Sequence, residues 1–143
     1  MNAKYFLDTN IFVYSFDDSQ PEKKDRALTL IAEGLTSGFA IISTQVIQEF
    51  LNVATRKFAN PLDVKDSKVY LNTVLNPLCE IFPDKALYEQ CLELQHETGY
   101  SFYDSLILSA ALRGACEVLF SEDLHDGQQI GNLTIVNPFL GDE

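Results

Sequence analysis

The sequence predicts a three-layer α/β/α sandwich around a mostly parallel sheet of roughly five strands. Short, mostly apolar runs alternate along the chain with longer segments that have helical periodicity, and this alternation favours a parallel sheet covered on both faces. No stretch rich in proline, glycine or serine divides the 143 residues, a length that suits one domain with its own core. We therefore expect a single domain over residues 1–143.

The predicted strands are mostly apolar, and each ends at a turn, a proline or a polar loop. In chain order they cover residues 4–7, 39–42, 78–82, 118–120 and 133–136. The first strand ends at the turn Asp8-Thr9-Asn10, and an apolar, aromatic stretch follows over 11–16. Because parallel strands end at one edge of a sheet, ligands of such folds bind beyond their carboxyl ends.

The predicted helices begin at a capping residue and end at a glycine or before a proline. In chain order they cover residues 21–36, 45–58, 63–75, 84–97 and 102–113. Ser19 and Glu22 have the spacing of a capping box for the first of these helices. Ser43-Thr44, Asp84 and Ser101 are expected to cap later ones.

The composition limits the classes of function. The formal net charge is -11, from 21 acidic against 10 basic residues, which argues against loose, non-specific binding of nucleic acid. That charge does not exclude a substrate held through a bound metal ion. Three dispersed cysteines without C-x-x-C spacing indicate reduced thiols. With no signal-peptide pattern and no apolar run of transmembrane length, we expect a cytoplasmic protein without a membrane partner.

Four carboxylates fall where the pattern otherwise predicts apolar core. Asp8 follows the first strand, Glu49 lies inside the helix over 45–58, Asp104 opens the last helix and Asp123 closely follows the fourth strand. No lysine or arginine is adjacent in sequence to any of them. A carboxylate in an apolar setting is costly unless something neutralises it, so four converging acids imply a hard divalent cation.

Each of these acids also has a purely structural interpretation. Asp8 has the position of an N-cap or Asx-turn residue, and Asp104 completes a Ser-x-x-Asp capping box with Ser101. Glu49 lies at the border of a polar helical stripe, where a solvated glutamate is common. Asp123 lies in a polar loop after a strand, which is itself a very common arrangement.

Four further residues are candidates for supporting roles. Asn10 and Ser121 could orient a carboxylate or a metal-bound water, and Asp126 is an alternative outer-sphere or second-metal group. Arg56 lies two turns beyond Glu49 on the same polar stripe, where a guanidinium could contact a substrate phosphate.

The donor set favours one kind of chemistry. Ligands that are all oxygen favour Mg²⁺ or Mn²⁺, and no His or Cys set has zinc spacing. Such ions orient a water, lower its pKa and stabilise a leaving oxygen, which is the chemistry of phosphodiester hydrolysis. Neither a Walker A loop nor a G-x-G-x-x-G motif occurs in the sequence.

Five segments together resemble the PIN domain of VapC-like toxins. They are Phe6-Leu7-Asp8-Thr9-Asn10, Glu49, Ser101-Phe102-Tyr103-Asp104, Ser121-Glu122-Asp123-Leu124 with Gly127-Gln128, and Val136-Asn137-Pro138-Phe139. The resemblance covers nearly the whole chain and implies a PIN-like α/β/α fold with Mg²⁺- or Mn²⁺-dependent ribonuclease activity. By position it implies an acidic site of Asp8, Glu49, Asp104 and Asp123, supported by Asn10 and Ser121. It also implies RNA as substrate, a homodimer, and a small antitoxin that inserts into the active-site groove.

Two alternatives remain open from the sequence. A haloacid-dehalogenase-like phosphatase also places an aspartate after its first strand, but it needs a second aspartate two residues later, where this chain has Asn10. A PIN fold that acts only as a binding module is the other alternative, against which the presence of all four acids argues. The sequence does not indicate which RNA is cut, or whether one or two ions act.

Overall fold

The structure is a computed structural model in which residues 3–140 are described, so the predicted domain over 1–143 extends past the described residues at both ends. Its sheet has six strands in the order β3-β2-β1-β4-β6-β5. Their bounds are β1 Tyr5–Leu7, β2 Ala40–Ser43, β3 Cys79–Ile81, β4 Val118–Phe120, β5 Gln129–Ile130 and β6 Leu133–Val136. All neighbouring strands are parallel except the pair β5 and β6. The predicted parallel α/β fold is therefore confirmed.

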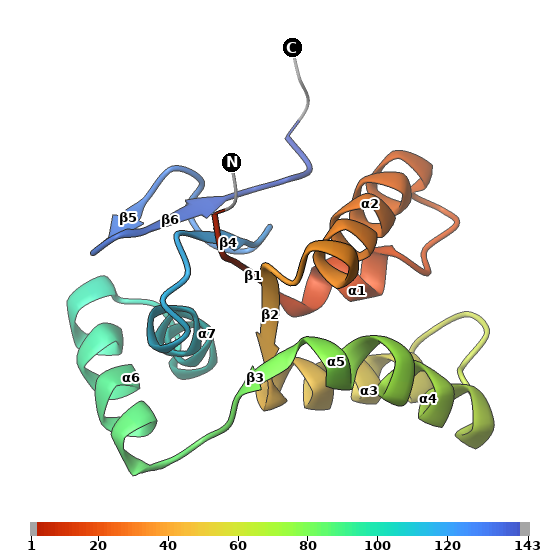
Figure 1. Ribbon diagram of the computed structural model, residues 1–143, viewed down its shortest axis with the longest axis horizontal. Helices are drawn as coiled ribbons and strands as arrows, with labels where there is room; N and C mark the ends of the chain where they lie inside the picture. Colours follow the sequence, from red (N-terminus) through yellow and green to blue (C-terminus); the bar gives the residue numbers. More distant parts are fainter. Residues whose placement is uncertain (1–2, 141–143) are drawn as a thin grey trace.

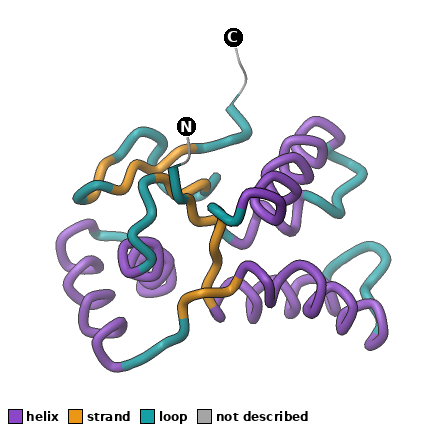
Figure 2. Tube along the Cα trace, viewed as in Figure 1, coloured by secondary structure: helices purple, strands orange, loops and turns teal. Residues whose placement is uncertain are grey.

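The helices connect these strands and cover the sheet. They are α1 Thr9–Tyr14, α2 Pro21–Ser37, α3 Thr44–Arg56, α4 Val64–Tyr70, the π-helical segment η1 Leu71–Leu75, α5 Asn76–Leu78, α6 Lys85–Thr98 and α7 Phe102–Arg113. Figure 1 shows α6 and α7 on one side of the strands and α1 to α5 on the other. In Figure 2 the strands accordingly lie between two groups of helices. This arrangement gives the three layers that the sequence predicts.

The core lies between the sheet and both helical layers. The central strands are buried: Phe6, Leu7, Ile41, Ile42 and Leu119 are all fully inaccessible to solvent. Burial on both faces explains why these strands read as continuous apolar runs in the sequence. Because β1 and β4 are neighbours in the centre of the sheet, the segments that follow them leave the core side by side.

Strand β5 is the main difference between the observed sheet and the roughly five-stranded sheet that the sequence predicts. β5 has only two residues and pairs antiparallel with β6, through Gln129 with Thr134 and Ile130 with Leu133. A two-residue strand is too short to show a periodicity in sequence, so the pattern could not predict it. It extends one edge of the sheet, away from the ends of β1 and β4.

Two predictions about helix ends are wrong. Ser19 and Glu22 do not form a capping box, because Gln20 is the N-cap of α2 and the Ser19 hydroxyl donates to Asp17 instead. The helix predicted over 63–75 does not end before Pro77. The chain passes through η1 into α5, where Pro77 lies at the start of a helical turn and needs no amide hydrogen.

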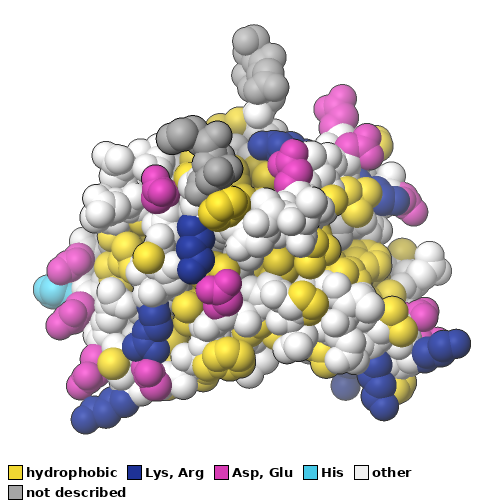
Figure 3. Space-filling model, in the orientation of Figure 1, with side chains coloured by type: hydrophobic (Ala, Val, Ile, Leu, Met, Phe, Trp, Pro, Cys, Tyr) yellow, Lys and Arg dark blue, Asp and Glu magenta, His cyan; other side chains and the backbone are white. Residues whose placement is uncertain are grey.

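The mixed charge of the surface and the state of the cysteines agree with what the composition indicates. Acidic and basic side chains alternate on the face drawn in Figure 3, without a continuous basic patch. Cys79, Cys91 and Cys116 are all free thiols, as predicted. Within the described residues, no helix has both the length and the apolar character needed to cross a membrane.

Candidate active site

A pocket of about 320 Å³ opens at the edge of the sheet where β1 and β4 end. All four of the acids singled out in the sequence line it, and they come from four different segments of the chain. The lining residues are Asp8, Thr9, Asn10, Gln45, Glu49, Asn52, Val53, Asp104, Ile107 and Asp123. The fold therefore brings the four carboxylates to one cavity.

Asp8 is the most deeply buried acid of the pocket, with 8% of its surface exposed. Its Oδ1 accepts the amide hydrogen of Thr9 at 2.7 Å and so caps α1, while Oδ2 accepts the hydroxyl of Ser121 at 2.7 Å. Burial, together with the nearby charges of Glu49 and Asp123, outweighs these hydrogen bonds and raises the pKa of Asp8 to about 6. The structural and functional interpretations of Asp8 are thus compatible.

Asp123 is held from two directions. Its Oδ2 accepts a hydrogen bond of 2.7 Å from the Asn10 side chain, and its amide donates to the Ser121 hydroxyl oxygen at 3.3 Å. Partial burial raises its pKa first, and the charges of Glu122 and Asp104 raise it further. A nearby positive charge would relieve this repulsion.

Glu49 connects α3 to α1, and its partner Gln45 connects α3 to α7. Its Oε1 accepts the Thr9 hydroxyl at 2.5 Å, and its Oε2 accepts the side-chain amide of Gln45 at 3.0 Å. The same Gln45 nitrogen also donates to the backbone carbonyl of Tyr103 at 3.0 Å, next to Asp104. These contacts fix the Glu49 side chain toward the pocket rather than toward bulk water.

Asp104 lies in the first turn of α7, where Ser101 is the N-cap. The Ser101 hydroxyl oxygen accepts the Asp104 amide hydrogen at 3.1 Å, which confirms Ser101 as a capping residue. The Asp104 carboxylate is half-buried and faces the pocket beside Asp123. A helix N-terminus favours a negative charge at this position.

Three of the predicted supporting residues lie outside the pocket lining. Ser121 is fully buried behind it and contacts two of its acids. Asp126 accepts the Asn137 amide hydrogen at 2.8 Å, which ties the loop after β4 to the end of β6. Arg56 is exposed at the last position of α3, one turn beyond the lining residue Asn52.

Sequence reasoning gave no role to Thr9, Gln45 or Asn52, which also line the pocket. Gln45 and Asn52 were visible as members of the polar stripe of α3, at one turn before and one turn after Glu49. Thr9 gave no separate signal, because a threonine in a turn between Asp and Asn is common.

The donor set suits a hard cation, but the acids are not gathered into a closed cage. Among residues 3–140, no three His, Cys, Asp or Glu side chains are arranged closely enough to hold one metal ion directly. Mg²⁺ in proteins commonly takes one or two carboxylates and keeps several waters. A carboxylate pocket with mutual repulsion and room for water fits that mode of binding.

The PIN domain family matches residues 5–125, which is most of the sequence. The chain belongs to the PIN domain family. The match ends before β5 and β6, yet β6 pairs with β4 and completes the sheet of this PIN domain. Family membership removes the phosphatase alternative, and in the structure Asn10 is engaged with Asp123. Comparison with curated proteins gives no match.

Solved structures of toxin–antitoxin proteins share the fold of this PIN domain. A toxin–antitoxin complex from Klebsiella pneumoniae is 20% identical with a TM-score of 0.68, covering 95% of this chain and 98% of that one. VapC20 from Mycobacterium tuberculosis, a sarcin-ricin loop cleaving toxin, is 19% identical with a TM-score of 0.56, covering 84% and 92%. VapBC2 from Rickettsia felis, bound to a promoter DNA fragment, is 21% identical with a TM-score of 0.60, covering 92% and 96%.

Proposed function

We propose that this PIN domain is a metal-dependent endoribonuclease that hydrolyses RNA phosphodiester bonds. The observation that carries the proposal is the convergence of Asp8, Glu49, Asp104 and Asp123 on one pocket at the carboxyl edge of the sheet. Structural needs alone do not explain four acids from four segments, since their mutual repulsion is unfavourable without a cation.

Mg²⁺ or Mn²⁺ is the cofactor that fits this donor set. Asp8 and Asp123 would hold the ion, because they line the pocket where the neighbouring strands β1 and β4 end and both lie close to other carboxylates. Glu49 and Asp104 line the same pocket and would hold its waters. When bound, such an ion supplies an activated water and stabilises the leaving oxygen of phosphodiester hydrolysis.

The protein's own residues keep these acids in place. Ser121 holds Asp8, Asn10 holds Asp123, and Thr9 holds Glu49, each through a side-chain hydrogen bond. Restraint of this kind keeps reacting groups within the narrow range of positions that catalysis requires. Arg56, exposed beyond Asn52, is proposed to contact a phosphate of the RNA.

We further propose that the biological role is that of the toxin in a toxin–antitoxin pair. The support is the shared fold with the toxin–antitoxin complexes from Klebsiella pneumoniae and Rickettsia felis. A small antitoxin protein would then be the physiological partner, and the toxin would act as a homodimer. Co-expression with a neighbouring antitoxin gene should restore growth that this chain alone inhibits, and sedimentation of the purified protein measures its assembly state.

The deciding experiment is RNA cleavage by purified protein. We expect structured RNAs to be cut in Mg²⁺ or Mn²⁺, and not in EDTA. Asp8→Asn and Asp104→Asn should abolish cleavage, because each removes one carboxylate charge that would hold the ion or its waters in the pocket. Asp25→Asn is the matched control, because Asp25 is exposed on α2 outside the pocket, and it should cut like the wild type.

Two outcomes would contradict the proposal. Equal cleavage by the Asp8 and Asp104 variants would assign the activity to a contaminant. RNA binding that is unaffected by EDTA, with no cleavage in either metal, would instead favour the catalytically silent binding module.

A further inference from the structure

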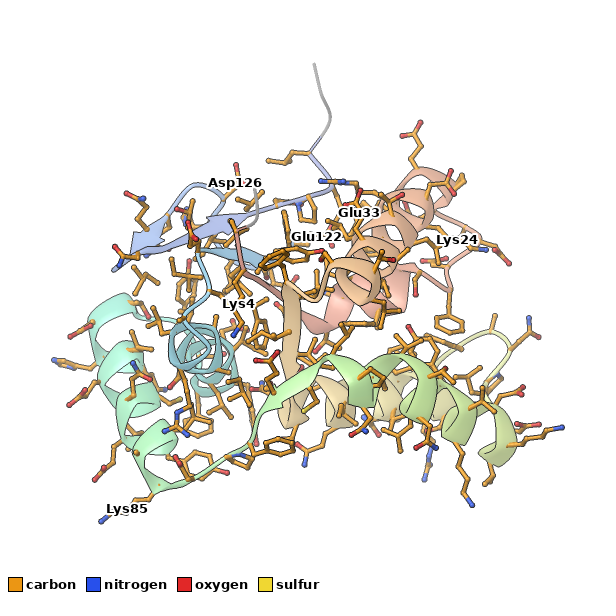
Figure 4. The ribbon with its side chains drawn as sticks, in the orientation of Figure 1. Lys4, Lys24, Glu33, Lys85, Glu122 and Asp126 are labelled. Atoms are coloured by element: carbon orange, nitrogen blue, oxygen red, sulfur yellow. The ribbon has the colours of Figure 1, made fainter. Side chains whose placement is uncertain are left out.

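The acid next to Asp123 is held on the side away from the pocket. Glu122 Oε1 accepts a hydrogen bond of 2.6 Å from the Tyr14 hydroxyl, and its Oε2 accepts one of 2.5 Å from the Lys23 ammonium. Tyr14 is the last residue of α1, and Lys23 lies in the first turn of α2. In Figure 4 the Glu122 label accordingly lies between the sheet and α2. Both carboxylate oxygens of Glu122 are thus bound by residues of α1 and α2, and Glu122 does not line the pocket.

Two aromatic rings, of Tyr14 and Phe139, lie beside the lysine of this ion pair. The Lys23 ammonium lies 4.7 Å from the centre of the Tyr14 ring and 5.6 Å from that of Phe139. The two rings meet edge to face at 4.9 Å. The side chains of Lys23 and Glu122 are only 31% and 23% exposed, so the pair is better shielded from water than an ordinary surface salt bridge.

One face of α1 binds two successive acids of the loop after β4. Asn10 and Tyr14 are four residues apart, and so lie one helical turn apart on the same side of α1. Asn10 donates to Asp123 at 2.7 Å and Tyr14 donates to Glu122 at 2.6 Å. The chain bends at Glu122 and Asp123, so the contacts that fix Glu122 against α1 also fix the backbone from which the Asp123 side chain extends.

We propose that Tyr14, Lys23 and Glu122, here called the Glu122 clamp, are positioning residues that hold Asp123 in the orientation needed to bind the metal ion. The inference rests on the proposed nuclease function and adds residues to its site. The clamp residues do not line the pocket, so the clamp acts through the backbone that joins Glu122 to Asp123. Lys23 also offsets the negative charge of Glu122, which would otherwise repel phosphates near this edge of the sheet.

Two conservative variants test the Glu122 clamp. Tyr14→Phe removes the hydroxyl and keeps the ring that packs on Phe139, while Glu122→Gln removes the charge and keeps an acceptor for Tyr14. We expect each to lower kcat for RNA and to raise the Kd for Mn²⁺ by about 10- to 100-fold, the usual effect of removing support for a metal ligand. KM for RNA should change by less than about twofold, because no substrate contact is lost.

The control breaks a comparable ion pair in the same helix. Lys24 pairs with Asp18 on the outer surface, away from the loop after β4, and its label in Figure 4 lies on the far side of α2. Lys24→Met should leave kcat and the Kd for Mn²⁺ at wild-type values. Calorimetric titration and kinetics are run below the melting temperature of every variant, so that loss of folded protein does not imitate loss of positioning.

The possible results separate the clamp from the proposed function. If wild type cleaves, Asp123→Asn does not, and the Tyr14 and Glu122 variants match wild type, the clamp is overturned and the nuclease function stands. If wild type neither binds Mn²⁺ nor cleaves RNA, the proposed function fails, and the clamp fails with it. An equal loss in Lys24→Met would also overturn the clamp, by showing that any ion pair on α2 has the same effect.

Discussion

Replacing Asp8 by asparagine should stabilise the metal-free protein at neutral pH while abolishing its activity. Asp8 is 8% exposed, and burial and nearby carboxylates raise its pKa from 3.8 to about 6. Asparagine is uncharged and is as good an N-cap as aspartate. It keeps an oxygen for the Thr9 amide and offers an amide hydrogen to the Ser121 oxygen, so the local hydrogen bonds survive.

The magnitude and direction of this change in stability follow from the difference between the pKa of Asp8 in the folded and in the unfolded chain. Between about pH 4 and pH 6, the unfolded chain has lost the proton of Asp8 and the folded chain still holds it, so the free energy of unfolding falls as pH rises. The rise from 3.8 to about 6 corresponds to about 3 kcal/mol of stability that is present in acid and absent at neutral pH. Asp8→Asn has no such loss.

The assay is urea unfolding of both proteins in EDTA, at several values between about pH 4 and pH 7. The free energy of unfolding of the wild type should fall by about 3 kcal/mol relative to that of Asp8→Asn across this interval. Saturating Mn²⁺ should raise the free energy of unfolding of the wild type and leave that of Asp8→Asn unchanged. Parallel pH curves for the two proteins would refute the reasoning, since they would mean that Asp8 has an ordinary pKa in the folded state.

Three more changes have defined expectations. Arg56→Ala should raise KM for RNA and leave the Kd for Mn²⁺ unchanged; unaltered cleavage kinetics would remove Arg56 from the site. Thr9→Val, which removes the hydrogen bond to Glu49, should lower kcat at least about tenfold with a melting temperature near that of wild type, as measured by circular dichroism. Gly34→Ala should cost about 1–3 kcal/mol in urea unfolding, because the added methyl would lie 2.4 Å from the Ala40 Cβ where α2 crosses β2; a wild-type midpoint would show that the two elements can separate freely.

The elements that the sequence predicts well are those with a strong local signal. The central strands β1, β2 and β4 are buried on both faces, so their apolar runs stand out between polar turns. The capping predictions at Asp84 and Ser101 are confirmed, since each accepts a backbone hydrogen bond from the first turn of its helix. The two-residue strand β5 and the passage through Pro77 depend on pairing and packing with distant segments, which a local pattern does not contain.

The candidate site likewise has a part that the sequence predicts and a part that it does not. The four acids were recognisable because a charge beside an apolar run is an anomaly in any single window of sequence. The contacts that orient them were not, because they join residues far apart in the chain, as Thr9 to Glu49 and Tyr14 to Glu122 do. In the sequence, Glu122 was merely one of three neighbouring acids in a polar loop. Its contacts with Tyr14 and Lys23, and its position outside the pocket lining, distinguish it from Asp123.

The most direct test of the central claim is the position of Mn²⁺ in a crystal of this protein, located by its anomalous scattering. The account predicts a peak inside the pocket lined by Asp8, Glu49, Asp104 and Asp123, and its loss in crystals of Asp8→Asn. A pocket without a peak at saturating Mn²⁺, or a peak that persists in Asp8→Asn, would contradict it.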